Sequence, residues 1–250
     1  MRSALAFLTV LPVGARLGPA RRATLIAFPL VGLAMGCASA ALAWGASEAW
    51  SPLVAAALLV ALDLVLTGGL HADAVADVAD GLASRKEPEE ALRIMREPQV
   101  GAIGAVTAGS VLLLRFAWLA VLAPAELWPL IAAVPVCGRV AMVVALSLSP
   151  EGHEPSLARG FAGAATPTVA ASAVLAGAAA CFAAGRIAGS GSAEGLAVGG
   201  LAAAVAGAVA CERAWRGRFG ALTGDATGAT GIAAEIAALA VFALTPAVEG

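Results

Sequence analysis

The sequence has few charged residues for its length, and this scarcity excludes an ordinary soluble domain. Asp, Glu, Lys and Arg make up 13% of the 250 residues, whereas a typical soluble domain has about 25%. Apolar residues make up 60% and the mean hydropathy is +0.90, which also excludes intrinsic disorder. A net charge of −2 offers no basic surface for a nucleic acid. We therefore expect an all-α protein, a polytopic transmembrane helical bundle in a lipid bilayer, with no nucleic-acid partner.

Several motifs are absent, and each absence removes a class of enzyme or site. The only lysine is Lys86 and there is no G-x-x-x-x-G-K-[ST], so the chain is not a P-loop NTPase. H-E-x-x-H and G-x-S-x-G are also missing. The four cysteines form no C-x-x-C pair, and we interpret them as small buried residues in apolar stretches.

Seven apolar segments are long enough, or nearly so, for a membrane span of about 20 residues. They are residues 23–46, 52–70, 102–123, 127–148, 167–185, 195–211 and 231–247. Small residues let transmembrane helices pack closely, and two G-x-x-x-G pairs occur, at Gly32 and Gly36 and at Gly195 and Gly199. The apolar run 3–13 is interrupted by Pro12 and followed by arginines, so we expect an uncleaved interfacial or re-entrant segment.

Lysine and arginine are distributed unevenly among the segments that flank the spans. Residues 1–22, 71–101, 149–166 and 212–230 hold twelve of them, and the intervening segments hold one. Because basic residues concentrate in cytoplasmic loops, we expect these four segments in the cytoplasm and the C-terminus outside. The chain would then be a single integral-membrane domain, residues 1–250, in the cytoplasmic (inner) membrane of a bacterium or archaeon.

The most hydrophilic stretch, residues 85–97, is expected to form a short helix. Pro88 suits a first helical turn, and the glutamates after it lie near the positive end of that helix. The helix would lie either on the membrane surface or in a solvated loop.

Aspartates gather at the end of the second apolar segment. Four of the five lie between positions 63 and 80, and Asp73, Asp77 and Asp80 are spaced four and three residues apart. On a helix they would fall within an arc of about 60°. Three carboxylates on one face repel each other unless a cation lies among them, and oxygen ligands favour Mg²⁺. Since Mg²⁺ commonly bridges to phosphates, the pattern indicates phosphoryl-transfer chemistry; the alternative is a water-exposed helix face without metal.

The residues just before this cluster carry a second signal. Gly68 and Gly69 would break the helix and permit close backbone approach to a ligand. His71 could be a metal ligand, a proton-transfer group or a positioning residue.

A later polar island, residues 222–231, contains the fifth aspartate. Asp225 could complete a metal shell or orient a nucleophile, while Gly224 and Gly228 could let backbone N–H groups approach a phosphate. A plain turn is the alternative.

Two arginines fall inside predicted spans, where charged residues are functional candidates. We expect Arg115 to face a polar cavity, where it would pair with Asp63 or bind a phosphate, and for Arg139 we favour contact with a substrate phosphate.

Five elements, in order, resemble the integral-membrane adenosylcobinamide-GDP ribazoletransferases, or cobalamin synthases. TGGLHADAVADVADGL (67–82) resembles their T-G-G-x-H-x-D-G-x-A-D-x-x-D-G signature, and TGDATGA (223–229) their late T-G-D-x-x-G-A motif. FLTVLPV (7–13), FPLVGLAMG (28–36) and MREPQVGAIG (95–104) are similar to further family segments. The chain departs from the pattern at Ala74, at Glu97 and Pro98, in the stretch 150–161, and in having Glu235 one turn beyond the family's late acidic position.

The resemblance implies the last assembly step of cobalamin. A hydroxyl of α-ribazole, or of its 5'-phosphate, attacks the cobinamide-side phosphate of adenosylcobinamide-GDP and GMP leaves, with Mg²⁺ as cofactor. Taken together, the residue patterns and the resemblance predict catalysis by His71, Asp73, Asp77, Asp80 and Asp225, metal binding by these four aspartates, and substrate binding by Gly68, Gly69, Arg96, Arg139, Thr223, Gly224 and Gly228. The predicted side of the membrane would put this active site at the cytoplasmic face.

Two other functions stay open at this stage. A membrane CDP-alcohol phosphotransferase would share Asp77, Asp80, Gly81 and Arg85, but the second half of that motif is missing. A secondary transporter would use Asp63, Arg115 and Arg139 along a midplane pathway. The sequence leaves open whether the chain forms a homo-oligomer.

Overall fold

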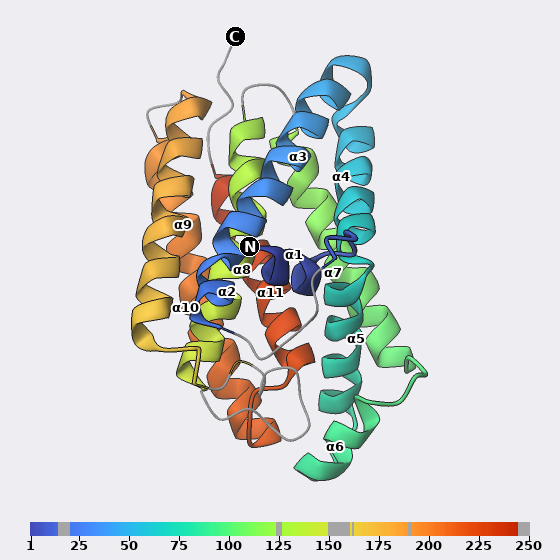
Figure 1. The fold of residues 1–250 in the computed structure, drawn as a ribbon. Coiled ribbons are helices and arrows are strands. Elements are labelled where there is room, and N and C mark those ends of the chain that lie inside the picture. Colours follow the sequence, from blue (N-terminus) through green and yellow to red (C-terminus); the bar gives the residue numbers. More distant parts are fainter. Residues whose placement is uncertain (15–20, 124–126, 150–160, 162, 190–191, 245–250) are drawn as a thin grey trace.

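The computed structural model describes residues 1–14, 21–123, 127–149, 161, 163–189 and 192–244, and these residues form helices and no strands (Figure 1). The helices are α1 (Arg2–Leu8), α2 (Arg22–Ile26), α3 (Phe28–Ala49), α4 (Pro52–Thr67), α5 (Leu70–Ala83), α6 (Pro88–Ile94), α7 (Ala102–Leu122), α8 (Trp128–Leu148), α9 (Pro167–Ala188), α10 (Ala193–Phe219) and α11 (Gly224–Phe242). The predicted all-helical class is confirmed.

The helices account for the expected number of spans. Six helical stretches are each long and apolar enough to cross a membrane, with α2 and α3 counted as one. Helix α4 has 16 residues, about 24 Å at 1.5 Å per residue, which is short for a bilayer core of about 30 Å. It continues into α5 after a bend of 88°, and the number of spans rises from six to the expected seven only if this bent pair is counted as one span rather than as a re-entrant loop.

The bend between α4 and α5 lies at the predicted glycine pair. Gly68 ends α4 at φ +63° and Gly69 precedes α5 at φ +74°, left-handed conformations that glycine adopts without strain. The N-terminal segment docks here, because the Val10 amide donates to the Leu66 carbonyl at 2.9 Å. A Cβ on Gly68 would lie 2.5 Å from Val10 Cγ1, so the close approach also depends on glycine.

Helix α8 forms the centre of the bundle, and nearly all of its residues are buried. Helix α3 packs on it through Gly32 and Gly36, where an added Cβ would overlap the carbonyl oxygens of Pro135 and Ala132. This G-x-x-x-G pair is a helix contact, as its spacing indicates. The second pair makes no such close approach: a Cβ on Gly195 would meet nothing within 4 Å, and one on Gly199 would lie 3.7 Å from Val241 Cγ1, an ordinary contact.

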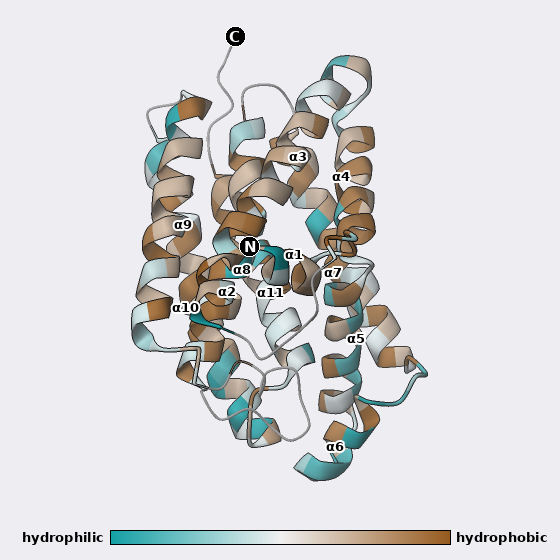
Figure 2. Ribbon diagram, in the orientation of Figure 1, coloured by the Kyte–Doolittle hydropathy of each residue, from teal (hydrophilic) through white to brown (hydrophobic). Residues whose placement is uncertain are grey.

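The outer helices expose apolar side chains, whereas polar residues gather at one end of the bundle. Val106, Leu113 and Leu175 are all exposed on α7 and α9, as expected of a surface that faces lipid. Figure 2 shows hydrophilic residues around α6 and the C-terminal turns of α10. The Arg218 guanidinium donates to the Lys86 carbonyl at 2.7 Å, so the predicted segments 71–101 and 212–230 meet at this end.

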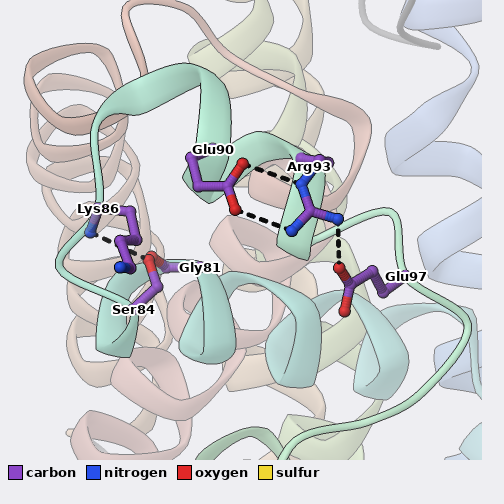
Figure 3. Close-up of polar contacts among 6 residues, drawn as sticks. All are labelled: Gly81, Ser84, Lys86, Glu90, Arg93 and Glu97. Atoms are coloured by element: carbon purple, nitrogen blue, oxygen red, sulfur yellow. Dashed lines mark hydrogen bonds and ion pairs between the residues drawn. The ribbon is translucent and has the colours of Figure 1, made fainter.

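Helix α6 is the expected short helix, but it does not present an apolar face to a membrane. Ala91 and Leu92 are buried in the main core, and Met95 packs against Gly81 of α5. On the opposite face, Arg93 bonds Glu90 and Glu97 (Figure 3). The hydrogen bonds from Arg93 lower the pKa of the Glu90 carboxyl. The helix is therefore docked on the protein, with its charged face in solvent.

Candidate functional site

Helix α5 carries the predicted acidic face. Asp73 is exposed, and Asp77 and Asp80 are partly exposed. Asp73 and Asp80 both lie close enough to Asp77 for their charges to interact. The fold thus gathers three carboxylates on one side of a helix that begins at the Gly68–Gly69 break.

The late polar island is not a loop but the start of α11. Thr223 caps this helix, since its Oγ1 accepts a hydrogen bond from the Ala226 amide at 3.0 Å. The span that we expected from residue 231 therefore begins at Gly224. Asp225 lies in the first turn, where the helix dipole favours a negative charge.

The two polar segments meet where α11 packs on α5. A Cβ on Gly228 would lie 2.9 Å from the Cβ of Ala74, so glycine permits this close approach. The charge of Asp225 interacts with those of Asp73 and Asp77. The helix segments that carry Asp225 and the α5 aspartates therefore lie side by side, and a shared site for their carboxylates stays a prediction.

Asp80 caps a neighbouring helix, a structural role that Asp73 and Asp77 do not have. Its Oδ2 accepts from the Gly101 amide at 2.7 Å and its Oδ1 from the Gly104 amide at 2.8 Å. These amides lie at the start of α7 and have no acceptor within that helix. The Asp80 carboxylate, which belongs to α5, therefore caps α7. A Cβ at either glycine would overlap the Asp80 side chain, which explains the two glycines of the 95–104 element.

We expect Asp80→Asn to destabilise the protein through this cap. An amide group can accept only one of the two hydrogen bonds well, and loss of a helix cap costs about 0.5–2 kcal/mol. Thermal unfolding in detergent should show a lower melting temperature. Asp73→Asn is the matched control, because its exposed side chain should change stability by less than about 0.5 kcal/mol. Equal melting temperatures for both variants would contradict the capping role.

The carboxylates do not form a closed metal cage by themselves. Among the described residues, no three His, Cys, Asp or Glu side chains converge tightly enough to hold a metal ion. Mg²⁺ does not need such a cage, since it keeps several waters and binds one or two carboxylates together with substrate phosphates. Asp77 and Asp225 offer two oxygen donors for that mode of binding, whereas Asp80 is already engaged by two amides. Metal binding by Asp73 stays a prediction.

His71 lies on the side of α5 that faces α11. It is buried, and its Nδ1 has no hydrogen-bond partner within the described ranges. With Gly224, Asp225 and Gly228 it lines a narrow cavity of about 40 Å³, room for little more than water. Its ring therefore reaches the α11 end of the site rather than the open acidic face.

Arg139 does not reach a site for phosphate. It is fully buried, and its Nη1 pairs with Glu235 while its Nη2 lies 3.3 Å from Met35 Sδ. Glu235 also pairs with Arg115, whose Nη2 lies 3.5 Å from Asp63 Oδ1. We expected Arg139 at a substrate; instead it belongs to a buried network of two acids and two arginines in which every charge has an opposite neighbour.

Glu235 is the residue whose role the sequence does not reveal. It comes from the middle of α11, and Gly138 of α8 leaves room for it, because a Cβ there would lie 2.5 Å from Glu235 Oε1. Because Glu235 lies one turn beyond the family's acidic position, the comparison of motifs did not assign it a role. A glutamate inside an apolar span is nevertheless a sign of a structural or functional partner.

Arg96 lies at the open side of the site. Its exposed side chain follows α6 and is near enough to Asp225 for the charges to interact. Most of the segment 149–161, whose role the sequence left open, lies outside the described residues. Phe161 is described and packs edge-on against Phe7 and Phe28, with ring centroids 5.0 and 5.8 Å away.

Comparisons with known proteins agree with the resemblance of the motifs. The family described as CobS, cobalamin-5-phosphate synthase, matches residues 1–243. A protein of Roseiflexus sp. (strain RS-1), named adenosylcobinamide-GDP ribazoletransferase, is 36% identical over 97% of this chain and 88% of its own length. Proteins of the same name from Chlorobaculum tepidum and Chlorobium chlorochromatii are 40% and 45% identical, over 59% and 48% of this chain and 58% and 46% of theirs. No solved structure matches.

Proposed function

Since the chain belongs to the CobS family of cobalamin-5-phosphate synthases, we propose that the acidic cluster between α5 and α11 joins adenosylcobinamide-GDP to α-ribazole or its 5'-phosphate. The chain is an adenosylcobinamide-GDP ribazoletransferase, which performs the final assembly step of cobalamin. The observation that carries the choice of site is the close packing of Gly228 of α11 on Ala74 of α5, which brings the segment that carries Asp225 to the helix that carries Asp73 and Asp77.

The reaction exchanges one phosphorus–oxygen bond for another. The ribazole hydroxyl oxygen attacks the phosphorus that carries the cobinamide, and the bond from that phosphorus to GMP breaks. Asp73 is exposed on the open side of the cluster and accepts the hydroxyl proton. Arg96 offsets the charge of the departing GMP phosphate at the same opening.

Mg²⁺ is the cofactor that this donor set fits. Asp77 and Asp225 would hold it, and when bound it would neutralise charge on the phosphates. Asp80 contributes by fixing the start of α7 beside α5.

The site would open to the cytoplasm. The basic segments predict this side, and Lys86 and Arg216 belong to the polar end of the bundle. We expect Lys86→Cys and Arg216→Cys, in a background without native cysteines, to react with an impermeant maleimide in inverted vesicles and not in intact cells. A cysteine at exposed Glu48 should react from outside; labelling of residue 86 or 216 in intact cells would reverse the orientation.

Purified protein should test the activity directly. We expect GMP release only when adenosylcobinamide-GDP, α-ribazole and Mg²⁺ are all present, with the phosphodiester product identified by mass spectrometry. Parallel reactions with a CDP-lipid and an alcohol acceptor test the alternative transferase. Product from the CDP-lipid, with none from the corrinoid, would refute the proposal.

A further inference from the structure

A second, much larger cavity lies on the other side of α5 from His71. It has a volume of about 690 Å³, is open to the surface, and forms where the N-terminal segment, the α4–α5 break and α7 meet. Its lining includes Phe7, Val10, Gly68, Asp73, Ala105 and Ala108. A pocket of this size matches an ordinary small-molecule ligand, for which volumes of about 300–1,000 Å³ are typical.

The walls of this cavity suit a flat apolar ring system. Most of the lining side chains are aliphatic, and Phe7 adds an aromatic ring that is itself held by stacking on Phe28 at a centroid distance of 5.7 Å. Two hydroxyls interrupt the apolar wall. Thr9 and Thr67 each donate to a main-chain carbonyl, at 2.7 and 2.8 Å. The Thr9 oxygen also accepts from the Leu11 amide at 3.4 Å, so the Thr67 oxygen is the better placed of the two to accept from a ligand.

One carboxylate joins this cavity to the acidic cluster. Asp73 lines the cavity, and its charge interacts with those of Asp77 and Asp225. A ligand that fills the apolar part could therefore present a hydroxyl group at Asp73, next to the place where the phosphates must lie. The narrow cavity beside His71 has no such room.

We propose that this cavity at the α4–α5 break is the subsite for the base of the nucleoside acceptor, the fused aromatic ring system of α-ribazole. This inference rests on the proposed function. A two-ring base matches the volume and the apolar walls, and the attached ribose would reach Asp73. The other substrate does not match, since a corrin macrocycle with adenosyl and GDP groups is too large and too polar to enter. Phe7 and the alanines of α7 then select the acceptor.

A larger side chain in the cavity should raise the KM for one substrate and leave the KM for the other unchanged. In Ala105→Phe a ring takes the place of the base, and we expect the KM for α-ribazole to rise about tenfold or more, because the apolar burial of one ring is lost. The KM for adenosylcobinamide-GDP should stay within about twofold. Val106→Phe is the matched control, because the neighbouring side chain is 67% exposed and does not line the cavity.

Equilibrium binding of α-ribazole alone, without the corrinoid, gives a readout that does not need turnover. Wild-type protein and Val106→Phe should bind it, and Ala105→Phe should bind it at least about tenfold more weakly. A rise in the KM for the corrinoid instead, or two unchanged KM values with unchanged binding, would overturn the subsite. If wild-type protein releases no GMP at all, the proposed function fails, and the binding result still decides whether the cavity takes a nucleoside.

Discussion

Asp77→Asn is expected to lower kcat for the transferase by about 100-fold or more, because it removes a charged ligand at the point where phosphate charge must be neutralised. Asn keeps the size of the side chain, and the charges of Asp73, Asp80 and Asp225 all act on Asp77. The variant should also need more Mg²⁺ for half-maximal activity. GMP release at a series of Mg²⁺ concentrations measures both effects.

Combining Asp77→Asn with Asp225→Asn tests whether the two residues serve one site. Groups that act on one cation behave as a unit, so the double variant should lose much less than the product of the two single losses. Glu90→Gln is the control, since it removes a carboxylate at the same end of the bundle that pairs with Arg93 in solvent. Losses that multiply independently would separate Asp225 from the cluster.

The spans and the acidic face were predictable because local physics determines them. Long apolar runs make membrane helices under almost any packing, and the spacing of Asp73, Asp77 and Asp80 fixes their common side once α5 forms. The break at Gly68 and Gly69 was predictable for the same reason, since two adjacent glycines end a helix without strain.

The start of α11 was not predictable from local pattern. Glycines and threonines after Thr223 disfavour helix by propensity, so the sequence predicted the last span only from residue 231. Close packing of Gly228 on Ala74 of α5 overrides that propensity. A glycine that weakens an isolated helix is the residue that lets two helices approach in a membrane.

Contacts between side chains on elements far apart in the chain could not be predicted from the sequence either. Asp80 looked equivalent to Asp73 and Asp77 until the fold brought the amides of Gly101 and Gly104 to it. Arg139 looked like a phosphate ligand because Glu235, its partner, comes from another span. Each role depends on tertiary contacts that spacing along one helix does not contain.

Glu235→Gln is expected to be the most destabilising single substitution. Glu235 pairs with both Arg115 and Arg139 in the interior of the bundle, and removal of its charge leaves Arg139 buried without a carboxylate beside it. Breaking a buried ion pair in this way typically costs about 3–5 kcal/mol. The yield of monodisperse protein and the melting temperature in detergent should both fall.

Two further variants show whether the loss of stability comes from an arginine left without its carboxylate or from a core that tolerates no substitution. Glu194→Gln breaks the exposed pair with Arg186 at 2.9 Å and should cost no more than about 1 kcal/mol, since solvent screens such pairs. Glu235→Gln combined with Arg139→Met removes the unpaired charge and leaves Arg115 beside Asp63, so it should recover much of the lost stability. If Glu235→Gln instead keeps the wild-type melting temperature and loses only GMP release, the network serves catalysis rather than folding.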